Sequence, residues 1–329
     1  EAMLYDAGVT KRFGRVDEGN SALDFEPEEL KRKTSISTAF HQFPWKKHKV
    51  NIIDTPGDQN FFSYTRTCMQ AADAAVVLVD AVDGVKVQTE LGWDFAEEFG
   101  MPCLIFVNKL DRERASFSRA FNEASEILQP KPIVLQLPIG QEDNFNGIVD
   151  LVAMKAYAYD DSGKGKETDI PADMADQVES ERENLVENVA EADDELLERY
   201  LEGETLSDAE IKAALKKGTL SRTFVPVLCG SALKNIGIDL LNDYIAQILP
   251  SPLEVGSRKA HDEKGENEIE IAPDPDGPFS AYIFKTVADP YAGRLSIFKI
   301  VSGSLGSDGV FYNVNKDTRE RFTQLLKIM

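Results

Sequence analysis

Residues 50–62 read VNIIDTPGDQNFF, a short apolar run that ends in a turn with carboxylates at Asp54 and Asp58. Pro56 cannot donate to a strand ladder, and Gly57 lets another group approach the backbone closely. A carboxylate at the end of a buried strand can hold a hydrated cation, and a glycine amide can donate to a phosphate oxygen. The stretch therefore predicts either a strand that closes in a plain tight turn or a strand that leads into a phosphate-binding turn.

Similar short apolar runs, rich in β-branched residues, recur along the chain at 74–81, 103–108 and 224–230. Residues 88–100 and 114–128 lie between them and carry apolar side chains at helical spacing. Short apolar strands that alternate with helices are typical of a parallel sheet covered on both faces. We therefore predict an α/β fold with a doubly wound, mostly parallel sheet, to which the run at 50–54 also contributes a strand.

The segment FVNKLD, residues 106–111, directly follows the third of these predicted strands. Asn108 can pair with the acceptor edge of a purine, and the Asp111 carboxylate can accept from both N–H donors of guanine. The methylene stem of Lys109 can lie along the ring while its charge stays in water. Taken alone, the segment is equally consistent with an exposed turn.

The segment CGSALKNIG, residues 229–237, follows the last predicted strand, and its small residues let backbone amides approach a ring oxygen. In a parallel sheet, ligands bind beyond the carboxyl ends of the strands. Asp54, Asn108 and Ser231 all fall at such ends. The three segments together predict a guanine-nucleotide site, although each is weak evidence by itself.

The composition limits the classes of partner. The 329 residues suffice for about two domains. Asp and Glu outnumber Lys and Arg 57 to 36, a net charge of −21, which disfavours autonomous binding of DNA or RNA. The three cysteines, Cys68, Cys103 and Cys229, have no zinc or disulfide spacing, which indicates a reducing, cytoplasmic location. No apolar run approaches the roughly 18 residues of a membrane span.

The chain resembles the translational GTPases, most closely the elongation factor G family, over essentially its whole length. The resemblance rests on six segments, which are HKVNIIDTPGD, FVNKLDRERASF, GIVDLVAMKAYAY, RYLEGETLSDAEIKAALKKGT, VLCGSALKNIGIDLLNDYIAQILPSP and DPYAGRLSIFKIVSGSL. It implies a P-loop-NTPase-like G domain, interrupted by an inserted α+β G′ subdomain and followed by part of a β-barrel domain. The corresponding boundaries are 1–149 and 223–257 for the G domain, 150–222 for the insert, 258–277 for a linker and 278–329 for the start of the barrel.

Within the acidic insert, Ser207 and Glu210 have the spacing of a capping box at a helix start. Gly218 follows two lysines and is expected to end that helix. The acidic character of the insert is explained either by a solvated helical face or by a docking surface for a basic or stalk-like partner.

The resemblance also implies GTP or GDP and Mg²⁺ as cofactors, and it assigns roles to individual residues. Asn108 and Asp111 would read guanine, with Lys109 and Leu110 in the same loop. The backbone of Ser231, Ala232 and Leu233 would meet the ring carbonyl. The turn Asp54, Thr55, Pro56, Gly57 and Asp58 would face the phosphates, with Asp54 and Ser35 at Mg²⁺ and with Gly57 and Asp58 as the catalytic candidates.

Two departures from the family pattern affect activity. No phosphate-binding loop of the pattern G-x-x-x-x-G-K-S/T occurs in the sequence, so we expect the chain as given to bind GTP poorly. The loss of three charge-assisted hydrogen bonds at about 1.5 kcal/mol each lowers affinity by about 10³. Asp58 stands where the family has a histidine that orients the attacking water. It is therefore either a water-positioning residue of altered character or a sign of weak hydrolysis.

The resemblance implies a divergent elongation factor G paralog that couples GTP hydrolysis on the ribosome to tRNA and mRNA translocation or to ribosome recycling. Its expected partners are rRNA and ribosomal proteins, among them a stalk protein if the acidic insert is a docking surface, and neither DNA nor a membrane. A cytoplasmic monomer is expected. The alternatives are another translational GTPase, of the release-factor or ribosomal-protection type, and a ribosome-binding regulator with weak or no hydrolysis.

Overall fold

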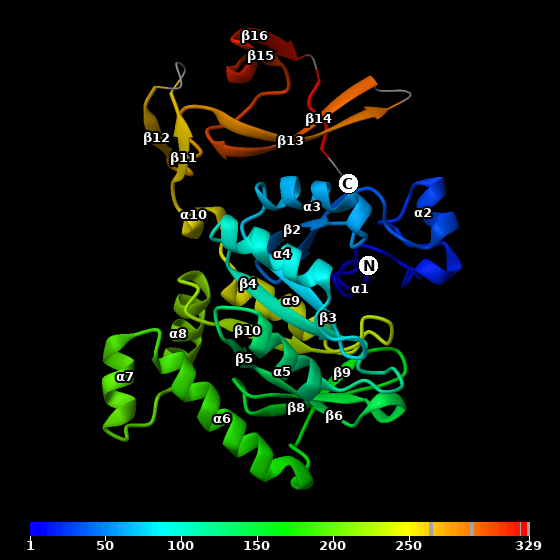
Figure 1. Cartoon of the computed structure of the whole chain (residues 1–329), viewed down its shortest axis with the longest axis vertical. Helices are drawn as coiled ribbons and strands as arrows, with labels where there is room; N and C mark the ends of the chain where they lie inside the picture. Colours follow the sequence, from blue (N-terminus) through cyan, green and yellow to red (C-terminus); the bar gives the residue numbers. More distant parts are fainter. Residues whose placement is uncertain (263–265, 290–292, 323, 328–329) are drawn as a thin grey trace. The chain divides into compact units, whose positions relative to one another are not determined.

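The computed structural model describes residues 1–262, 266–289, 293–322 and 324–327. The chain forms two compact units, drawn in Figure 1. The first unit contains Glu1–Met69 and Ala74–Leu249, and the second contains Gln70–Asp73 and Pro250–Met329. Each unit is described by itself.

The core of the first unit is a four-stranded parallel sheet. Its strands lie in the order β3 (Ala75–Asp80), β4 (Cys103–Asn108), β10 (Val225–Cys229) and β5 (Pro132–Val134). In Figure 1, α4 (Val87–Glu98) and α5 (Phe117–Ile127) lie in front of the sheet and α9 (Ile238–Ile248) lies behind it. The doubly wound α/β fold is therefore confirmed, as are the predicted strands at 74–81, 103–108 and 224–230.

The run at 50–54 is a strand, but it does not join the parallel sheet among the described residues. It belongs to β2 (His48–Asp54), which pairs antiparallel with β1 (Ala39–Trp45) in a separate two-stranded sheet. Val50 and Ile52 pack on a small core around Leu4 and Phe43, whereas Asn51 is exposed. The expected place in the parallel sheet is wrong, because no residue of this strand is fully buried, whereas β4 and β10 in the middle of the parallel sheet are buried almost throughout.

Shorter helices flank this hairpin. They are α1 (Ala2–Asp6), α2 (Pro27–Arg32) and α3 (Phe62–Met69). The 3-10 turn η2 (Gln59–Phe61) connects the D-T-P-G turn to α3. No described helix is both long and apolar enough to cross a membrane.

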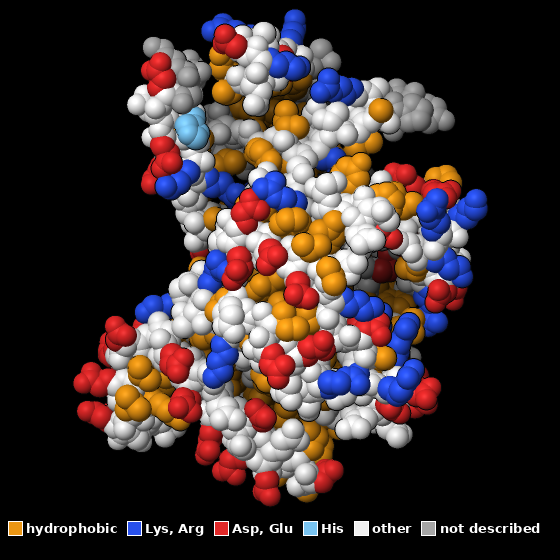
Figure 2. Space-filling model, viewed as in Figure 1, with side chains coloured by type: hydrophobic (Ala, Val, Ile, Leu, Met, Phe, Trp, Pro, Cys, Tyr) orange, Lys and Arg blue, Asp and Glu red, His pale blue; other side chains and the backbone are white. Residues whose placement is uncertain are grey.

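Residues 136–220 add an antiparallel sheet and three helices to the first unit. The sheet order is β6 (Gln136–Ile139), β7 (Gly147–Asp150), β8 (Lys155–Tyr159) and β9 (Gly165–Thr168). The helices are α6 (Ala175–Ala190), α7 (Asp194–Leu201) and α8 (Asp208–Leu220). Figure 2 shows that Asp and Glu side chains gather over α6 and α7.

The predicted start of α8 is confirmed, and its predicted end is wrong. The Ser207 hydroxyl accepts from the Glu210 amide, and the Glu210 carboxylate accepts from the Ser207 amide. The helix continues past Gly218 to Leu220. A Cβ at position 218 would lie 2.3 Å from the Phe224 ring, so this glycine serves close packing inside the helix rather than its termination.

The described residues of the second unit form α10 (Pro252–Val255) and three antiparallel strand pairs. These pairs are β11 (Arg258–His261) with β12 (Glu268–Ile271), β13 (Ser280–Asp289) with β14 (Gly293–Ser302), and β15 (Gly309–Asn313) with β16 (Thr318–Phe322). Residues 290–292 of the motif DPYAGRL lie outside the described part. Asp73 is bound within this unit by Arg258 and Lys299.

Candidate functional site

The side chain of Asn108 joins two loops at the carboxyl edge of the parallel sheet. Its Oδ1 accepts hydrogen bonds from the amide of Lys109 at 2.8 Å and from the amide of Ala232 at 2.9 Å. The amide of Leu110 also donates to the carbonyl of Gly230 at 3.3 Å. The structure therefore brings the predicted N-K-x-D and S-A-L loops together.

Lys109 is held in a left-handed conformation, with φ of 67°, that non-glycine residues seldom adopt. Its Nζ lies 2.5 Å from Oδ2 of Asp80, the last residue of the neighbouring strand β3. Burial acts to raise the pKa of Asp80, but the hydrogen bonds from Lys109 and the Val82 amide hold it below its usual range. Asp80 thus contacts the candidate site through Lys109, and the sequence did not single it out although it ends an apolar run as Asp54 does.

Asp111 presents an unsatisfied acceptor beside these loops. Its Oδ1 is buried and has no hydrogen-bond partner among the described residues. A buried carboxylate oxygen without a donor is costly unless a ligand supplies one. The N–H donors of a guanine ring are of the required type, so the residues present fit this base.

The other residues predicted for base binding differ in accessibility. Leu110 and Ser231 are buried, whereas the Leu233 side chain is exposed. The Ser231 amide donates to the Ile236 carbonyl, and the Ile236 amide donates back to the Ser231 carbonyl. The loop 231–236 is thus closed on itself, and only its backbone and exposed side chains can face a ligand.

The D-T-P-G turn is held from within the same unit. The carbonyl of Pro56 accepts from the buried Thr65 hydroxyl at 3.2 Å. Gly57 is exposed, and a Cβ there would meet no atom within 4 Å. Asp58 caps the next turn, because its Oδ1 accepts from the amide of Asn60 at 2.8 Å and from its Nδ2 at 2.7 Å. Open space therefore surrounds Gly57, while the adjacent carboxylate is engaged.

Asp54 lies in an acidic neighbourhood that it shares with Ser35. Burial raises the pKa of Asp54, and the carboxylates of Asp24 and Glu29 raise it further. The Ser35 hydroxyl donates to Asp24 Oδ1 at 2.7 Å. Oxygen donors of this kind suit Mg²⁺, which keeps several waters and needs few protein ligands. The described residues contain no group of three or more His, Cys, Asp or Glu that could hold a metal by itself.

The predicted site is thus only partly assembled by direct contacts. Among the described residues, no hydrogen bond or ion pair joins the turn 54–58 to the loop 108–111. Convergence of all three loops on one ligand stays a prediction. Thr55, which lies between Asp54 and Asp58 in the sequence, is half-buried.

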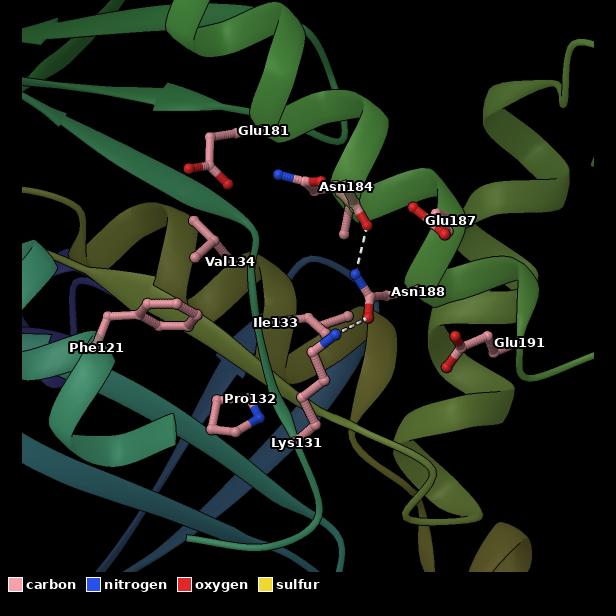
Figure 3. A pocket seen from close by; sticks show the side chains of 11 residues that line it. Phe121, Lys131, Pro132, Ile133, Val134, Glu181, Asn184, Glu187, Asn188 and Glu191 are labelled. Atoms are coloured by element: carbon pink, nitrogen blue, oxygen red, sulfur yellow. Dashed lines mark hydrogen bonds between the residues drawn. The ribbon is translucent and has the colours of Figure 1, made fainter. Parts of the chain in front are cut away.

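A cavity of about 350 Å³ lies elsewhere, between α5, β5 and α6. Figure 3 shows the Lys131 amine directed to Asn188, whose Oδ1 it contacts at 2.7 Å. None of the lining residues belongs to the predicted nucleotide site. The candidate site is therefore the open edge of the sheet and not this cavity.

Comparison with known proteins shows the family to which the chain belongs. The family described as "Elongation factor Tu GTP binding domain" matches residues 1–251. A crystal structure of a protein from Thermus thermophilus is similar, with a TM-score of 0.85 and 30% sequence identity over 98% of this chain and 46% of that one. The chain therefore spans about half the length of that solved protein. It belongs to the elongation factor Tu GTP-binding domain family of translational GTPases.

Proposed function

We propose that the chain is the nucleotide-binding part of an elongation-factor-G-like GTPase of the cytoplasm. In this role the complete protein binds GTP or GDP with Mg²⁺ and hydrolyses GTP on the ribosome. Hydrolysis is coupled to translocation of tRNA and mRNA or to ribosome recycling. Family membership supports the guanine nucleotide. The observation that carries the proposal is the buried, partnerless Oδ1 of Asp111 beside the joined loops.

Base recognition is assigned to the two joined loops. The Asp111 carboxylate accepts from the ring N–H donors of guanine, and the Asn108 amide nitrogen donates to the acceptor edge. The methylene stem of Lys109 packs along the ring. The ion pair between Lys109 and Asp80 supports this assignment, because it fixes the direction of the Lys109 side chain. The backbone of Ser231, Ala232 and Leu233 faces the ring carbonyl. Because the Ser231 and Ala232 amides donate to Ile236 and Asn108, the Leu233 amide is the one assigned to donate to that carbonyl.

The phosphate side is assigned to the D-T-P-G turn. The open space at Gly57 allows its amide to donate to a terminal phosphate oxygen. Asp54 and Ser35 would hold Mg²⁺, which neutralises phosphate charge when bound. Asp24 and Glu29 add negative charge around Asp54, and this supports a cation in the neighbourhood.

A second function, that of a ribosome-binding regulator with little hydrolysis, is favoured by the environment of Asp58. Its Oδ1 already accepts two hydrogen bonds from Asn60, so less of this carboxylate is available to position a water. Multiple-turnover phosphate release on ribosomes distinguishes the two functions. The regulator predicts negligible turnover for the wild type and faster turnover for Asp58→His in the complete protein.

The acidic helices α6 and α7 are the proposed contact for a ribosomal stalk protein. Their exposed carboxylates, seen in Figure 2, favour a basic partner. Such a contact should weaken as salt concentration rises.

The central test of the proposed function is a substitution of Asp111 that should change the preference of the site from guanine to xanthine nucleotides. Asp111→Asn in the complete protein replaces an acceptor by an amide, so affinity for GDP should fall by at least about 10² while affinity for xanthosine diphosphate rises. Asp143→Asn is the control, because the Asp143 side chain is exposed and makes no hydrogen bond among the described residues. Unchanged GDP affinity for Asp111→Asn would reject the assigned base site.

A further inference from the structure

The turn between β8 and β9 lies directly against the loop that carries Ala232. Asp160 shapes this turn, because its carbonyl accepts from the Gly163 amide at 2.9 Å and its Oδ1 accepts from the Ser162 amide at 2.8 Å. These bonds hold Gly163 at φ of 74°, in the left-handed region. The turn therefore presents bare glycine backbone to its neighbour.

That neighbour is Asn235. A Cβ at Gly163 would lie 2.5 Å from Asn235 Cβ and 3.1 Å from the Lys234 carbonyl oxygen, so no side chain fits between them. Asn235 is only 6% exposed and has φ of 56°. Its Nδ2 donates to Asp6 Oδ1 at 2.6 Å, which fixes it from the side of α1. Asn235 is thus held between α1 and the β8–β9 turn.

The same antiparallel sheet supports the end of this loop. The Tyr159 hydroxyl donates to Asp239 Oδ1 at 2.6 Å, in the first turn of α9. A Cβ at Gly237 would lie 2.4 Å from Ile148 Cδ1 of β7. Residues of β7, of β8 and of the β8–β9 turn therefore contact the chain from Lys234 to the first turn of α9.

We propose that Gly163 and Asn235 are positioning residues for the guanine-nucleotide site, through which the antiparallel sheet sets the rate of nucleotide release. This rests on the proposed function. Asn235 precedes Ile236, which pairs with Ser231 through two backbone hydrogen bonds. Ala232 follows and donates to Asn108. A displacement at Asn235 is therefore passed by short, direct contacts to the residue expected to read the base.

The test compares two glycines in the complete protein. Gly163→Ala and Gly203→Ala carry the same left-handed backbone strain, since Gly203 has φ of 85°, but a Cβ at Gly203 meets nothing within 4 Å. Release of a fluorescent GDP analogue should be about ten-fold faster in Gly163→Ala, because small displacements in a binding site have large effects on it. Gly203→Ala should release at the wild-type rate. Equal rates in the two variants would overturn the proposal.

A double-mutant cycle separates this role from general destabilisation. Asn235→Gly tolerates the left-handed backbone and removes the Cβ that Gly163→Ala meets. It also removes the side chain that holds the loop to Asp6, so it should accelerate release by itself. Adding Gly163→Ala to it should then change the rate less than about two-fold, whereas a full further acceleration of about ten-fold would contradict the contact. If Gly163→Ala does not fold, Asn235→Gly decides alone, and an unchanged rate rejects the proposal. A wild type that binds no GDP analogue rejects the proposed function itself, and the inference with it.

Discussion

The side-chain oxygen of Asn108 accepts a hydrogen bond of 2.9 Å from the amide of Ala232, 124 residues later in the chain. The same oxygen accepts from the adjacent Lys109 amide at 2.8 Å. One atom thus joins two loops of the candidate site. The amide nitrogen of Asn108 donates to no described residue, which leaves it available to a ligand.

Two substitutions at Asn108 separate these roles. Asn108→Asp keeps an oxygen for both backbone amides but removes the donor, so it should abolish detectable GDP binding with little loss of folding stability. Asn108→Ala removes both, so it should also lower the free energy of unfolding by about 1–3 kcal/mol. Calorimetry and urea denaturation of the complete protein measure the two effects. Equal stability of the two variants would show that the bonds to Lys109 and Ala232 are energetically unimportant.

The same residue shows how far the sequence predicts the site. The pattern N-K-x-D indicates the donor of Asn108 and the acceptor of Asp111, because those roles follow from side-chain chemistry alone. The bond from Ala232 was not predictable, since it depends on how two distant strands lie in the sheet. Asp80 was missed for a similar reason, because its partner Lys109 lies on the neighbouring strand's loop.

The fold shows a corresponding limit. Continuous apolar runs predicted β3, β4 and β10, which are the strands of the parallel sheet longer than three residues. The short strand β5 was not predicted, although it lies in the apolar run PIVL at residues 132–135. β2 was placed in the wrong sheet because VNIID is short enough to suit either a half-buried or a buried strand. Periodicity indicates a strand, but its partner is decided by tertiary packing.

Asp58 is expected to stabilise the turn that follows it. Its Oδ1 caps η2 through Asn60, so Asp58→Ala should lower the free energy of unfolding by about 0.5–1 kcal/mol. Asp58→Asn keeps the acceptor oxygen and should differ from the wild type by less than that. Urea denaturation measures both variants. A loss in Asp58→Asn as large as that in Asp58→Ala would mean that the carboxylate charge, rather than the cap, provides the stability.

Two glycines inside helices should respond to alanine in opposite directions. A Cβ at Gly92 in α4 would make only one ordinary contact, 3.6 Å from the Phe62 ring, so Gly92→Ala should stabilise by about 0.5–1 kcal/mol through helix propensity. A Cβ at Gly218 in α8 would lie 2.3 Å from the Phe224 ring, so Gly218→Ala should destabilise by about 1–3 kcal/mol. Thermal unfolding of both variants tests the pair, and two shifts of the same sign would contradict it.

Asp6 should make the stability of the first unit depend on pH. The pKa of Asp6 is raised from 3.8 to about 6, mainly by burial; the hydrogen bond from Asn235 opposes this increase and the Asp239 carboxylate adds to it. The folded state holds the Asp6 proton more tightly than the unfolded state does. Protonation of Asp6 therefore stabilises the folded state fully below about pH 3.8, and this stabilisation is lost as the pH rises to about 6.

The measurement is the free energy of unfolding of the wild type minus that of Asp6→Asn, taken from about pH 3.5 to about pH 8. The contributions of the other carboxylates cancel in this difference. It should fall between about pH 4 and pH 6 and stay constant above about pH 7. Asn235→Ala removes the hydrogen bond that lowers the pKa of Asp6, so the fall should move to higher pH in that background. A difference that is constant across the range would show that the carboxyl of Asp6 titrates alike in both states.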